Sequence, residues 1–301
     1  MKRLIALAVA TASLVLTSAA DAKVAVFTCE PEWTALAHEL GGDRIDASSA
    51  TTGLQDPHQI QARPSLIAKM RAADMVVCTG AELEIGWLPV LLRQGANPKV
   101  QPGAPGYFEA ARFVGMKEAP QALDRSLGDV HAGGNPHIQT DPRNMLPVAK
   151  ALTDQFVRVD PAGADVYRAN LAAFNTRWTA AIEGWQQKAA ALKGVPVLVQ
   201  HKSWVYLIDW LGMREVAPLE PKPGIAPSTA YLVELLSKVE AEKPRMILAA
   251  AYEDDRGSKW MAEHAKIPAV TLPFTVGGDA GTDTLTGLYD VTIQKLTAAL
   301  R

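Results

Sequence analysis

The chain has 301 residues, with 30 basic and 32 acidic side chains and a net charge of −2 at pH 7. This balance argues against nucleic acid or an anionic membrane surface as the main partner, because both select basic chains. Hydrophobic residues make up 48% of the sequence, enough for the cores of two domains or of one large domain.

The N-terminus has the pattern of a cleaved export signal. Basic residues precede the apolar run Leu4–Leu16, which is shorter than the roughly 20 residues that a membrane-spanning helix needs. Ala20-Asp21-Ala22 then supplies the small residues that signal peptidase prefers, so residues 1–22 are predicted to be a signal peptide. No Cys stands at this cleavage point, and no later apolar run is long enough to cross a membrane. We therefore expect a soluble periplasmic protein and not a lipoprotein.

Strands and helices alternate through the first half, which indicates βαβ units on a parallel sheet. Residues 23–157 are accordingly predicted to be an N-terminal α/β domain. Strands are predicted at Val24–Thr28, Ile45–Thr52 and Met75–Thr79, with a short one between Asn97 and Pro120, and helices at Glu30–Gly41, Ser65–Ala73, Glu84–Arg93 and Pro142–Val157.

The chain contains two cysteines, Cys29 and Cys78. In an oxidising compartment an isolated pair can form a disulfide, and two buried thiols are the alternative. Each cysteine lies at the end of a predicted strand, so the two are candidates for neighbours in one sheet. We expect the disulfide.

A long helix is predicted next, because no proline occurs between Pro161 and Pro196 while apolar residues recur in steps of three and four. Roughly 30 residues at 1.5 Å each would span about 45 Å, longer than a typical globular helix. We interpret residues 158–193 as a stiff connector whose aromatic stripe packs along two domains. Coiled-coil dimerisation is the competing interpretation, but the stripe is short and rich in alanine for a zipper. The stripe comprises Tyr167, Leu171, Phe174, Trp178, Ala181, Trp185, Ala189 and Leu192.

The alternation resumes in residues 194–301, which are predicted to be a C-terminal α/β domain. The expected fold is therefore α/β, with two domains of similar size on parallel sheets, joined by one long α-helix. A Pro-rich stretch lies at residues 217–227. Strands are predicted at Val195–Val199, Arg245–Ala251 and Ala269–Leu272, and helices at Tyr206–Leu211, Thr229–Glu242, Ser258–Ala265 and Thr284–Leu300.

Three of the six histidines lie in loops beside predicted strand ends or helix starts. His58 follows the second strand, His137 precedes a helix that Asp141 can cap, and His201 follows the first strand of the second half. Ligands of open α/β sheets bind outside the carboxyl ends of the strands, so a site between the domains is predicted to gather all three. Three imidazoles and one carboxylate suit tetrahedral Zn²⁺, whereas carboxylates in place of imidazoles would favour Mn²⁺.

The remaining histidines receive other interpretations. His38 and His264 fall within predicted helices and are expected to be surface or structural residues. His131 is interpreted as a solvated loop residue, with a role as accessory ligand as the alternative. The sequence has no His-Glu-x-x-His motif, no Gly-x-Ser-x-Gly motif and no phosphate-binding loop, which disfavours the enzyme classes that use them.

With these features the chain resembles the metal-receptor class of periplasmic substrate-binding proteins, which serve ABC importers for zinc or manganese. The resemblance rests on Asp56-Pro57-His58, on Gly134-Asn135-Pro136-His137 and on His201, within two α/β halves joined by a long helix. It implies that these three histidines bind the metal, and it is closer to the zinc members because manganese members tend to have a carboxylate at the third position. The implied partner is the membrane permease of the importer, with a periplasmic metallochaperone as a further candidate and a monomer as the expected state.

The resemblance also implies an acidic fourth ligand in the loop after the last strand, where Asp279 matches best. The preceding residues 274–278 depart from the commoner family pattern, so Glu253, Asp254, Asp283 or a water stays open as an alternative. Many zinc receptors carry a long loop rich in His and acidic residues, which is absent here. His131 is a candidate for a reduced substitute that shuttles metal inward.

Two rival functions remain at this point. The first is a manganese or iron receptor on the same scaffold. The second is a secreted zinc-dependent hydrolase, because three histidines with an open coordination position also form a catalytic arrangement. Glu253 is the candidate general base of such an enzyme.

Overall fold

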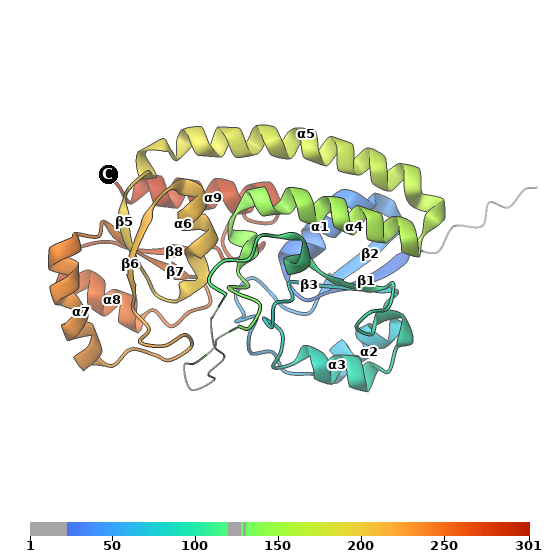
Figure 1. The fold of residues 1–301 in the computed structure, drawn as a ribbon, viewed down its shortest axis with the longest axis horizontal. Helices are drawn as coiled ribbons and strands as arrows, with labels where there is room; N and C mark the ends of the chain where they lie inside the picture. Colours follow the sequence, from blue (N-terminus) through green and yellow to red (C-terminus); the bar gives the residue numbers. More distant parts are fainter. Residues whose placement is uncertain (1–22, 120–127, 129–130) are drawn as a thin grey trace, which may run out of the picture.

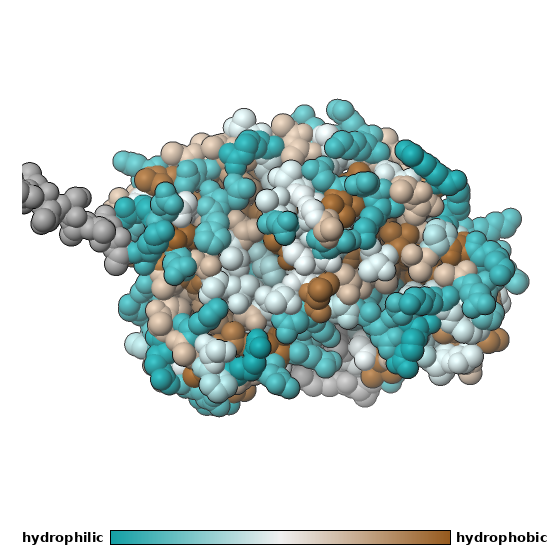
Figure 2. Space-filling view, turned by 180° about the vertical axis from the view of Figure 1, so that it is seen from behind, coloured by the Kyte–Doolittle hydropathy of each residue, from teal (hydrophilic) through white to brown (hydrophobic). Residues whose placement is uncertain are grey.

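The structure, a computed structural model, describes residues 23–119, 128 and 131–301. The predicted signal peptide at residues 1–22 lies outside the described part of the chain. The described residues form two α/β domains side by side, and helix α5 (Ala164–Lys188) runs along both of them (Figure 1). None of the described helices combines the length and the apolar character that crossing a membrane requires. The face opposite to that in Figure 1 is covered mainly by hydrophilic residues, with apolar residues scattered among them (Figure 2).

The N-terminal domain is built on a parallel sheet with the strand order β2-β1-β3-β4. Its central strands are almost entirely buried, as expected for the short apolar runs of parallel strands that helices cover on both faces. Helices α1 and α4 pack on one face of the sheet, and α2 and α3 pack on the other. The bounds are β1 Val24–Thr28, β2 Ile45–Ser49, β3 Met75–Cys78, β4 Tyr107–Glu109, α1 Pro31–Gly41, α2 Pro64–Ala72, α3 Leu88–Gly95 and α4 Met145–Val159.

Helix α3 begins later than its predicted start at Glu84. The Glu84 carboxylate accepts hydrogen bonds from the backbone N–H groups of Thr79 (2.8 Å) and Gly80 (3.1 Å), which holds this segment in tight turns. Ala81 and Glu82 adopt positive φ angles of 51° and 67°, which a right-handed helix excludes. A buried side chain bound to the backbone therefore overrides the helical pattern of the sequence here.

Cys29 and Cys78 form a disulfide, as expected. Strands β1 and β3 pair in parallel, and the cysteines stand at their neighbouring carboxyl ends. Both side chains are fully buried. The bond therefore joins two central strands of the N-terminal sheet beside the loops that follow them.

Helix α4 gives way to α5 at Asp160, whose carboxylate accepts hydrogen bonds from Arg44 Nε (2.9 Å) and from the Tyr167 hydroxyl (2.6 Å). Helix α5 lies within the predicted connector at residues 158–193 and packs against α1, α4 and α9 of the same chain. The aromatic stripe is therefore buried within the chain, and no coiled-coil partner is needed to cover it. The buried residues of the stripe are Tyr167, Phe174, Trp178, Trp185, Ala189 and Leu192, and Ile182 of α5 is buried beside them.

The C-terminal domain repeats the architecture, with the strand order β6-β5-β7-β8. Strand β6 (Arg214–Pro218) escaped prediction because it is an edge strand that starts with two charged residues and ends in proline. Ser228 caps helix α7 as its sequence pattern indicates, with its hydroxyl accepting from Tyr231 N–H. The remaining bounds are β5 Pro196–Val199, β7 Met246–Ala250, β8 Ala269–Leu272, α6 Val205–Leu211, α7 Thr229–Glu242, α8 Arg256–Ala265 and α9 Leu285–Ala298.

One hydrophobic core runs through both domains. It extends from the N-terminal sheet through the aromatic stripe of α5 to β7 and α9 in the C-terminal domain. Two buried hydrogen bonds reinforce the junction: Trp178 Nε1 donates to Pro142 O (2.7 Å), and Tyr289 Oη donates to Gln139 O (2.6 Å). The two domains are therefore fused along the helical side of the molecule, and their strand ends meet on the other side.

Candidate metal centre

Three histidines converge where the carboxyl ends of the two sheets meet. His58 comes from the loop after β2, His137 from the loop before α4, and His201 from the end of β5. One nitrogen of each lies within 4.8 Å of the nitrogens of the other two. The ring centroids are 5.3 Å apart for His58 and His137, 5.8 Å for His58 and His201, and 5.6 Å for His137 and His201. The arrangement that the sequence predicts for these three residues is thus present in the fold.

The orientation of His58 is set by Asp56. The Asp56 Oδ1 atom lies 2.8 Å from His58 Nδ1 and also accepts from the His58 backbone N–H at 2.9 Å. Burial opposes ionisation of Asp56, but its hydrogen bond and charge interaction with His58 outweigh burial and lower its pKa. His58 Nε2 is buried and has no hydrogen-bond partner among the described residues, so this nitrogen is the one that faces a ligand.

His201 is oriented by a carboxylate in the same way. Its Nδ1 lies 2.7 Å from Glu220 Oε2, which also accepts from Gly224 N–H at 2.8 Å. Burial acts most strongly to lower the pKa of His201, but the hydrogen bond and charge of Glu220, together with the charges of Glu253 and Asp56, outweigh it and raise the pKa. A carboxylate behind a ligating imidazole fixes its tautomer and increases its basicity toward a metal.

His137 is the most deeply buried of the three, with 1% of its surface exposed. Its backbone N–H donates to Asn135 Oδ1 (3.1 Å), and Asn135 Nδ2 donates to Lys202 O (2.8 Å) in the other domain. Burial, followed by the neighbouring charges of His58, His201 and His131, holds the pKa of His137 well below its ordinary value. The imidazole is therefore neutral near pH 7, which is the form that binds metal.

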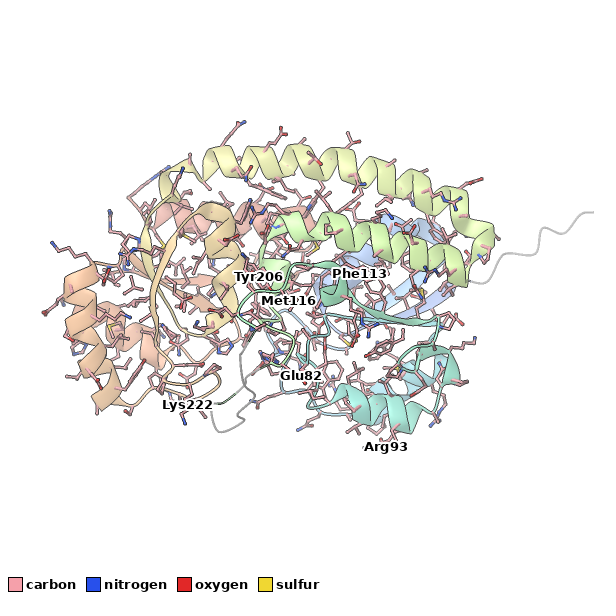
Figure 3. All side chains as sticks on the ribbon, in the orientation of Figure 1. Glu82, Arg93, Phe113, Met116, Tyr206 and Lys222 are labelled. Atoms are coloured by element: carbon pink, nitrogen blue, oxygen red, sulfur yellow. A yellow bond between two sulfur atoms is a disulfide. The ribbon has the colours of Figure 1, made fainter. Side chains whose placement is uncertain are left out.

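Tyr206 of α6 ties the loop of His137 to the C-terminal domain. Its hydroxyl donates to Asn135 O at 2.8 Å and accepts from Lys117 N–H at 3.1 Å. Figure 3 shows Tyr206 beside Met116 at this junction, and the hydroxyl lies 3.9 Å from the Met116 sulfur. The Asn-Pro-His motif is thus held from both domains.

Asp279, the predicted fourth ligand, is not brought into the histidine cluster. Its carboxylate forms an ion pair with Lys295 on α9, and its backbone N–H donates to Thr282 Oγ1 (3.0 Å). The same loop instead presents Phe274 edge-on to His137, with ring centroids 5.3 Å apart. The loop after β8 therefore contributes an aromatic ring to the site, while its carboxylate turns toward a lysine.

The group of ligand atoms formed by the three histidines does not include the alternative carboxylates Glu253, Asp254 and Asp283 either. Asp254 is exposed and forms an ion pair with Arg256 at 2.5 Å, and Asp283 is exposed. Glu253 accepts from Ala250 N–H at 2.8 Å, and burial raises its pKa to about 7. Among the described acidic residues next to the histidines, Asp56 and Glu220 lie behind the rings, whereas Glu253 acts on His201 through its charge.

Sequence reasoning underestimated His131. The residue is half-buried, and its ring centroid lies 5.4 Å from that of His58, comparable to the spacing within the cluster. The short spacing between His131 and His137 across two glycines was the signal that could have indicated this position. His38 and His264 are exposed, as expected. The His264 ring stacks on the Trp260 ring within α8, with ring centroids 3.8 Å apart.

A groove of about 510 Å³ leads from the surface to His58 and His201. Asp56, Glu220 and Glu253 line it, which gives it a negative character. Carboxylates along a cleft raise the local concentration of cations. The groove is therefore suited to the approach of a metal ion.

A second group of potential ligand atoms lies at the carboxyl ends of β1 and β3 and comprises Cys29, Cys78 and Glu84. Its two sulfur atoms are bonded to each other, so they offer no thiolate. Burial raises the pKa of Glu84 to about 7 and that of the adjacent Glu30 well above its ordinary value. In the disulfide form this group serves to shape the turns after β3.

The chain matches known proteins along most of its length. A sequence model of the family described as zinc-uptake complex component A, periplasmic (ZnuA), matches residues 26–299. Over 267 residues the chain is 25% identical to the metal ABC transporter substrate-binding lipoprotein FimA of Streptococcus parasanguinis, and the match covers 86% of this chain and 82% of that protein. Over 262 residues it is also 25% identical to the manganese ABC transporter substrate-binding lipoprotein PsaA of Streptococcus pneumoniae. This match covers 84% of this chain and 80% of PsaA.

The fold has a counterpart among solved structures. A crystal structure of ZnuA superimposes on it with a TM-score of 0.77, at 22% sequence identity. The match covers 93% of this chain and 100% of that chain. At this level of identity the likeness establishes the shared fold.

Proposed function

The chain belongs to the family of zinc-uptake complex component A, periplasmic, and from this membership we propose that it captures Zn²⁺ between its domains and presents it to a membrane permease. The family consists of metal-binding substrate-binding proteins of ABC importers, which act outside the cytoplasm with a membrane permease and an ATPase. Its members are solute-binding proteins and not enzymes, so the rival prediction of a secreted zinc hydrolase is wrong.

The cluster of His58, His137 and His201 is the observation that carries the proposal. One of its members comes from the C-terminal domain and two come from the N-terminal domain, so a bound ion would bridge the two. Two of the rings are backed by carboxylates, and the third is neutral because of its burial. This is the arrangement of a preformed site for a divalent cation.

The choice of zinc follows from the chemistry of the donors. Imidazole nitrogen suits Zn²⁺, whereas Mn²⁺ prefers carboxylate, carbonyl and water oxygen. The relative PsaA is named for manganese, so a manganese receptor is the rival on the same scaffold. Asp279, the carboxylate expected at the fourth position, is paired with Lys295, which leaves a site dominated by nitrogen.

We expect binding to involve loop movement and little domain closure. Helix α5 and the continuous core join the domains along one side, and Asn135 links the His137 loop to the domain of His201. The Glu220 loop is held at the site through its contacts with His201 and Gly224. Small movements of such loops are enough to enclose an ion.

We further propose that the protein works as a soluble periplasmic monomer after export directed by residues 1–22. The relatives FimA and PsaA are named lipoproteins, whereas the family is described as periplasmic. The use of the α5 stripe within the chain supports the monomer. The intact mass of the protein purified from the periplasm, together with its mass in light scattering, tests both points.

A metal competition experiment tests the proposed cargo. The protein is stripped with a chelator, dialysed against equal concentrations of Zn²⁺ and Mn²⁺, and its metal content is measured by mass spectrometry. We expect about one zinc per chain and little manganese. Retention of manganese in preference to zinc would assign the chain to the rival function, and retention of neither metal would refute both the zinc and the manganese assignment.

A further inference from the structure

A fourth imidazole ring, that of His131, lies beside the three clustered histidines at a similar spacing. His131 lies against His58, with ring centroids 5.4 Å apart, inside the 5.3–5.8 Å range of the three pairwise spacings in the cluster. His131 also lines a small cavity of about 100 Å³ together with His137 and His201. It therefore contacts one member of the cluster and shares a cavity with the other two.

The local backbone holds His131 at this position. The carbonyl of His131 accepts from Gly134 N–H at 3.2 Å, and the next residue, Ala132, donates its N–H to Glu82 Oε2 at 3.0 Å. Gly134 has a φ of 101°, which favours glycine, and an added Cβ there would meet the carbonyl oxygen of Lys117 at 2.7 Å. The turn thus brings two histidines of one short segment, His131 and His137, to the same site.

The carboxylates near the site have other partners, including Glu253, which lines the groove with His58 and His201 and accepts from Ala250 N–H at 2.8 Å. Asp56 and Glu220 contact the Nδ1 atoms of His58 and His201, which is the position behind a metal ligand. Asp279 is paired with Lys295, and Phe274 covers the side of His137 that faces the loop after β8. A tetrahedral ion held by three imidazoles needs one more donor, and His131 supplies a nitrogen without breaking any of these pairs.

We propose that His131 is the fourth metal ligand, so that the ion is held by four imidazoles and no carboxylate. The inference deepens the proposed function and depends on it. A nitrogen of His131 has to move toward the point shared by the other three, because the group within 4.8 Å comprises His58, His137 and His201. Closure of the 131–134 turn on the ion is the loop movement that completes the site. Four neutral nitrogen donors and no oxygen donor select Zn²⁺ over Mn²⁺.

X-ray absorption at the zinc edge counts the imidazoles directly. The full-length mature protein loaded with one equivalent of Zn²⁺ is compared with His131→Ala and with Asp279→Ala, which is the matched control at the position that the sequence favours. We expect four imidazoles in the wild type and in Asp279→Ala, and three imidazoles with one oxygen in His131→Ala. Three imidazoles with one oxygen in the wild type would overturn the inference.

Affinity provides an independent readout. Zinc affinity, measured by competition with a chromophoric chelator, should fall in His131→Ala by more than the roughly 10–100-fold that loss of an outer-shell partner costs, and stay unchanged in Asp279→Ala. His131→Asp should recover part of the loss and narrow the preference for Zn²⁺ over Mn²⁺. Equal thermal unfolding of the metal-free variants shows that the loop substitution leaves the fold intact.

The outcomes separate this inference from the proposed function. If the wild type binds no zinc, the proposed function itself fails. If the wild type binds zinc, His58→Ala abolishes binding and His131→Ala keeps wild-type affinity, the receptor stands and the four-histidine site is refuted.

Discussion

The Nδ1 atom of His201 lies 2.7 Å from the Oε2 atom of Glu220, and the two residues come from different elements of the C-terminal domain. His201 follows the central strand β5, and Glu220 follows the edge strand β6. The contact directs the other ring nitrogen of His201 toward His58 and His137. The geometry of the metal centre therefore depends on a strand that contributes no ligand of its own.

Replacing Glu220 with Gln should weaken zinc binding without removing it. The amide keeps the size of the side chain but loses the charge that supports the His201 imidazole, and loss of such outer-shell partners typically costs roughly 10–100-fold in metal affinity. Isothermal titration of the metal-free protein with Zn²⁺ measures the change. Glu242→Gln is a suitable control, because Glu242 pairs with Arg214 on the surface. An affinity of Glu220→Gln equal to that of the control would contradict the role of Glu220.

Acidification should release zinc first through His201. The pKa of His201 is raised because Glu220, Glu253 and Asp56 together outweigh its burial, whereas burial and neighbouring histidines hold the pKa of His137 well below the ordinary value. Because the pKa is raised, protons compete with Zn²⁺ at His201 at pH values above about 6.5, the ordinary pKa of histidine. Zinc affinity measured over a pH series should therefore begin to fall while the pH is still above about 6.5. Glu220→Gln should move this fall to lower pH, and an unchanged midpoint would argue against His201 as the first site to protonate.

Removing the disulfide should reduce stability while zinc affinity stays the same. Cys29 and Cys78 are 49 residues apart, and the chain-entropy relation gives about 4 kcal/mol for a loop of this length. The cysteines belong to a group of side chains separate from the histidines. Urea unfolding of Cys29→Ala/Cys78→Ala measures the first effect, and zinc titration measures the second. A large loss of zinc affinity with little loss of stability would be the opposite of what we expect.

Zinc binding should cause little change in overall shape. Helix α5 and the core that passes through it fuse the domains on one side, and the Asn135–Lys202 hydrogen bond links them at the site. Small-angle scattering of the metal-free and zinc-loaded protein should give nearly the same radius of gyration. A compaction typical of hinge-closing binding proteins would contradict this rigid arrangement.

Much of the fold could be predicted because its signals are local. The strands Val24–Thr28 and Ala269–Leu272 and the helix Thr229–Glu242 have the predicted bounds, since apolar runs and a serine cap mark their ends. Strand β6 was not predicted, because its sequence is charged and contains proline. Its pairing with β5 stabilises the strand, and the sequence shows no sign of that pairing. Helix α3 starts late because Glu84 binds the backbone after β3, a contact that no periodicity reveals.

The site residues also fall into those that local sequence signals predict and those that depend on tertiary contacts. His58, His137 and His201 could be found because each lies after a strand or before the helical turn that Asp141 caps, where topology fixes the direction of the loop. The position of Asp279 depends on Lys295 in a later helix, and that of His131 on a turn held by Glu82. Both are tertiary contacts. The pairing of Asp279 leaves no pattern in the sequence, and the only sequence signal for His131 is its short spacing from His137.

The zinc affinities of His58→Ala, His137→Ala and His201→Ala test the central claim most directly. His264→Ala serves as the control, because His264 is exposed and stacks on Trp260 in α8. We predict that each of the three substitutions lowers affinity by more than the roughly 100-fold upper range for outer-shell changes, while the control binds like the wild type. Wild-type affinity in any of the three variants, or an equal loss in His264→Ala, would contradict the assignment of these histidines as the metal centre.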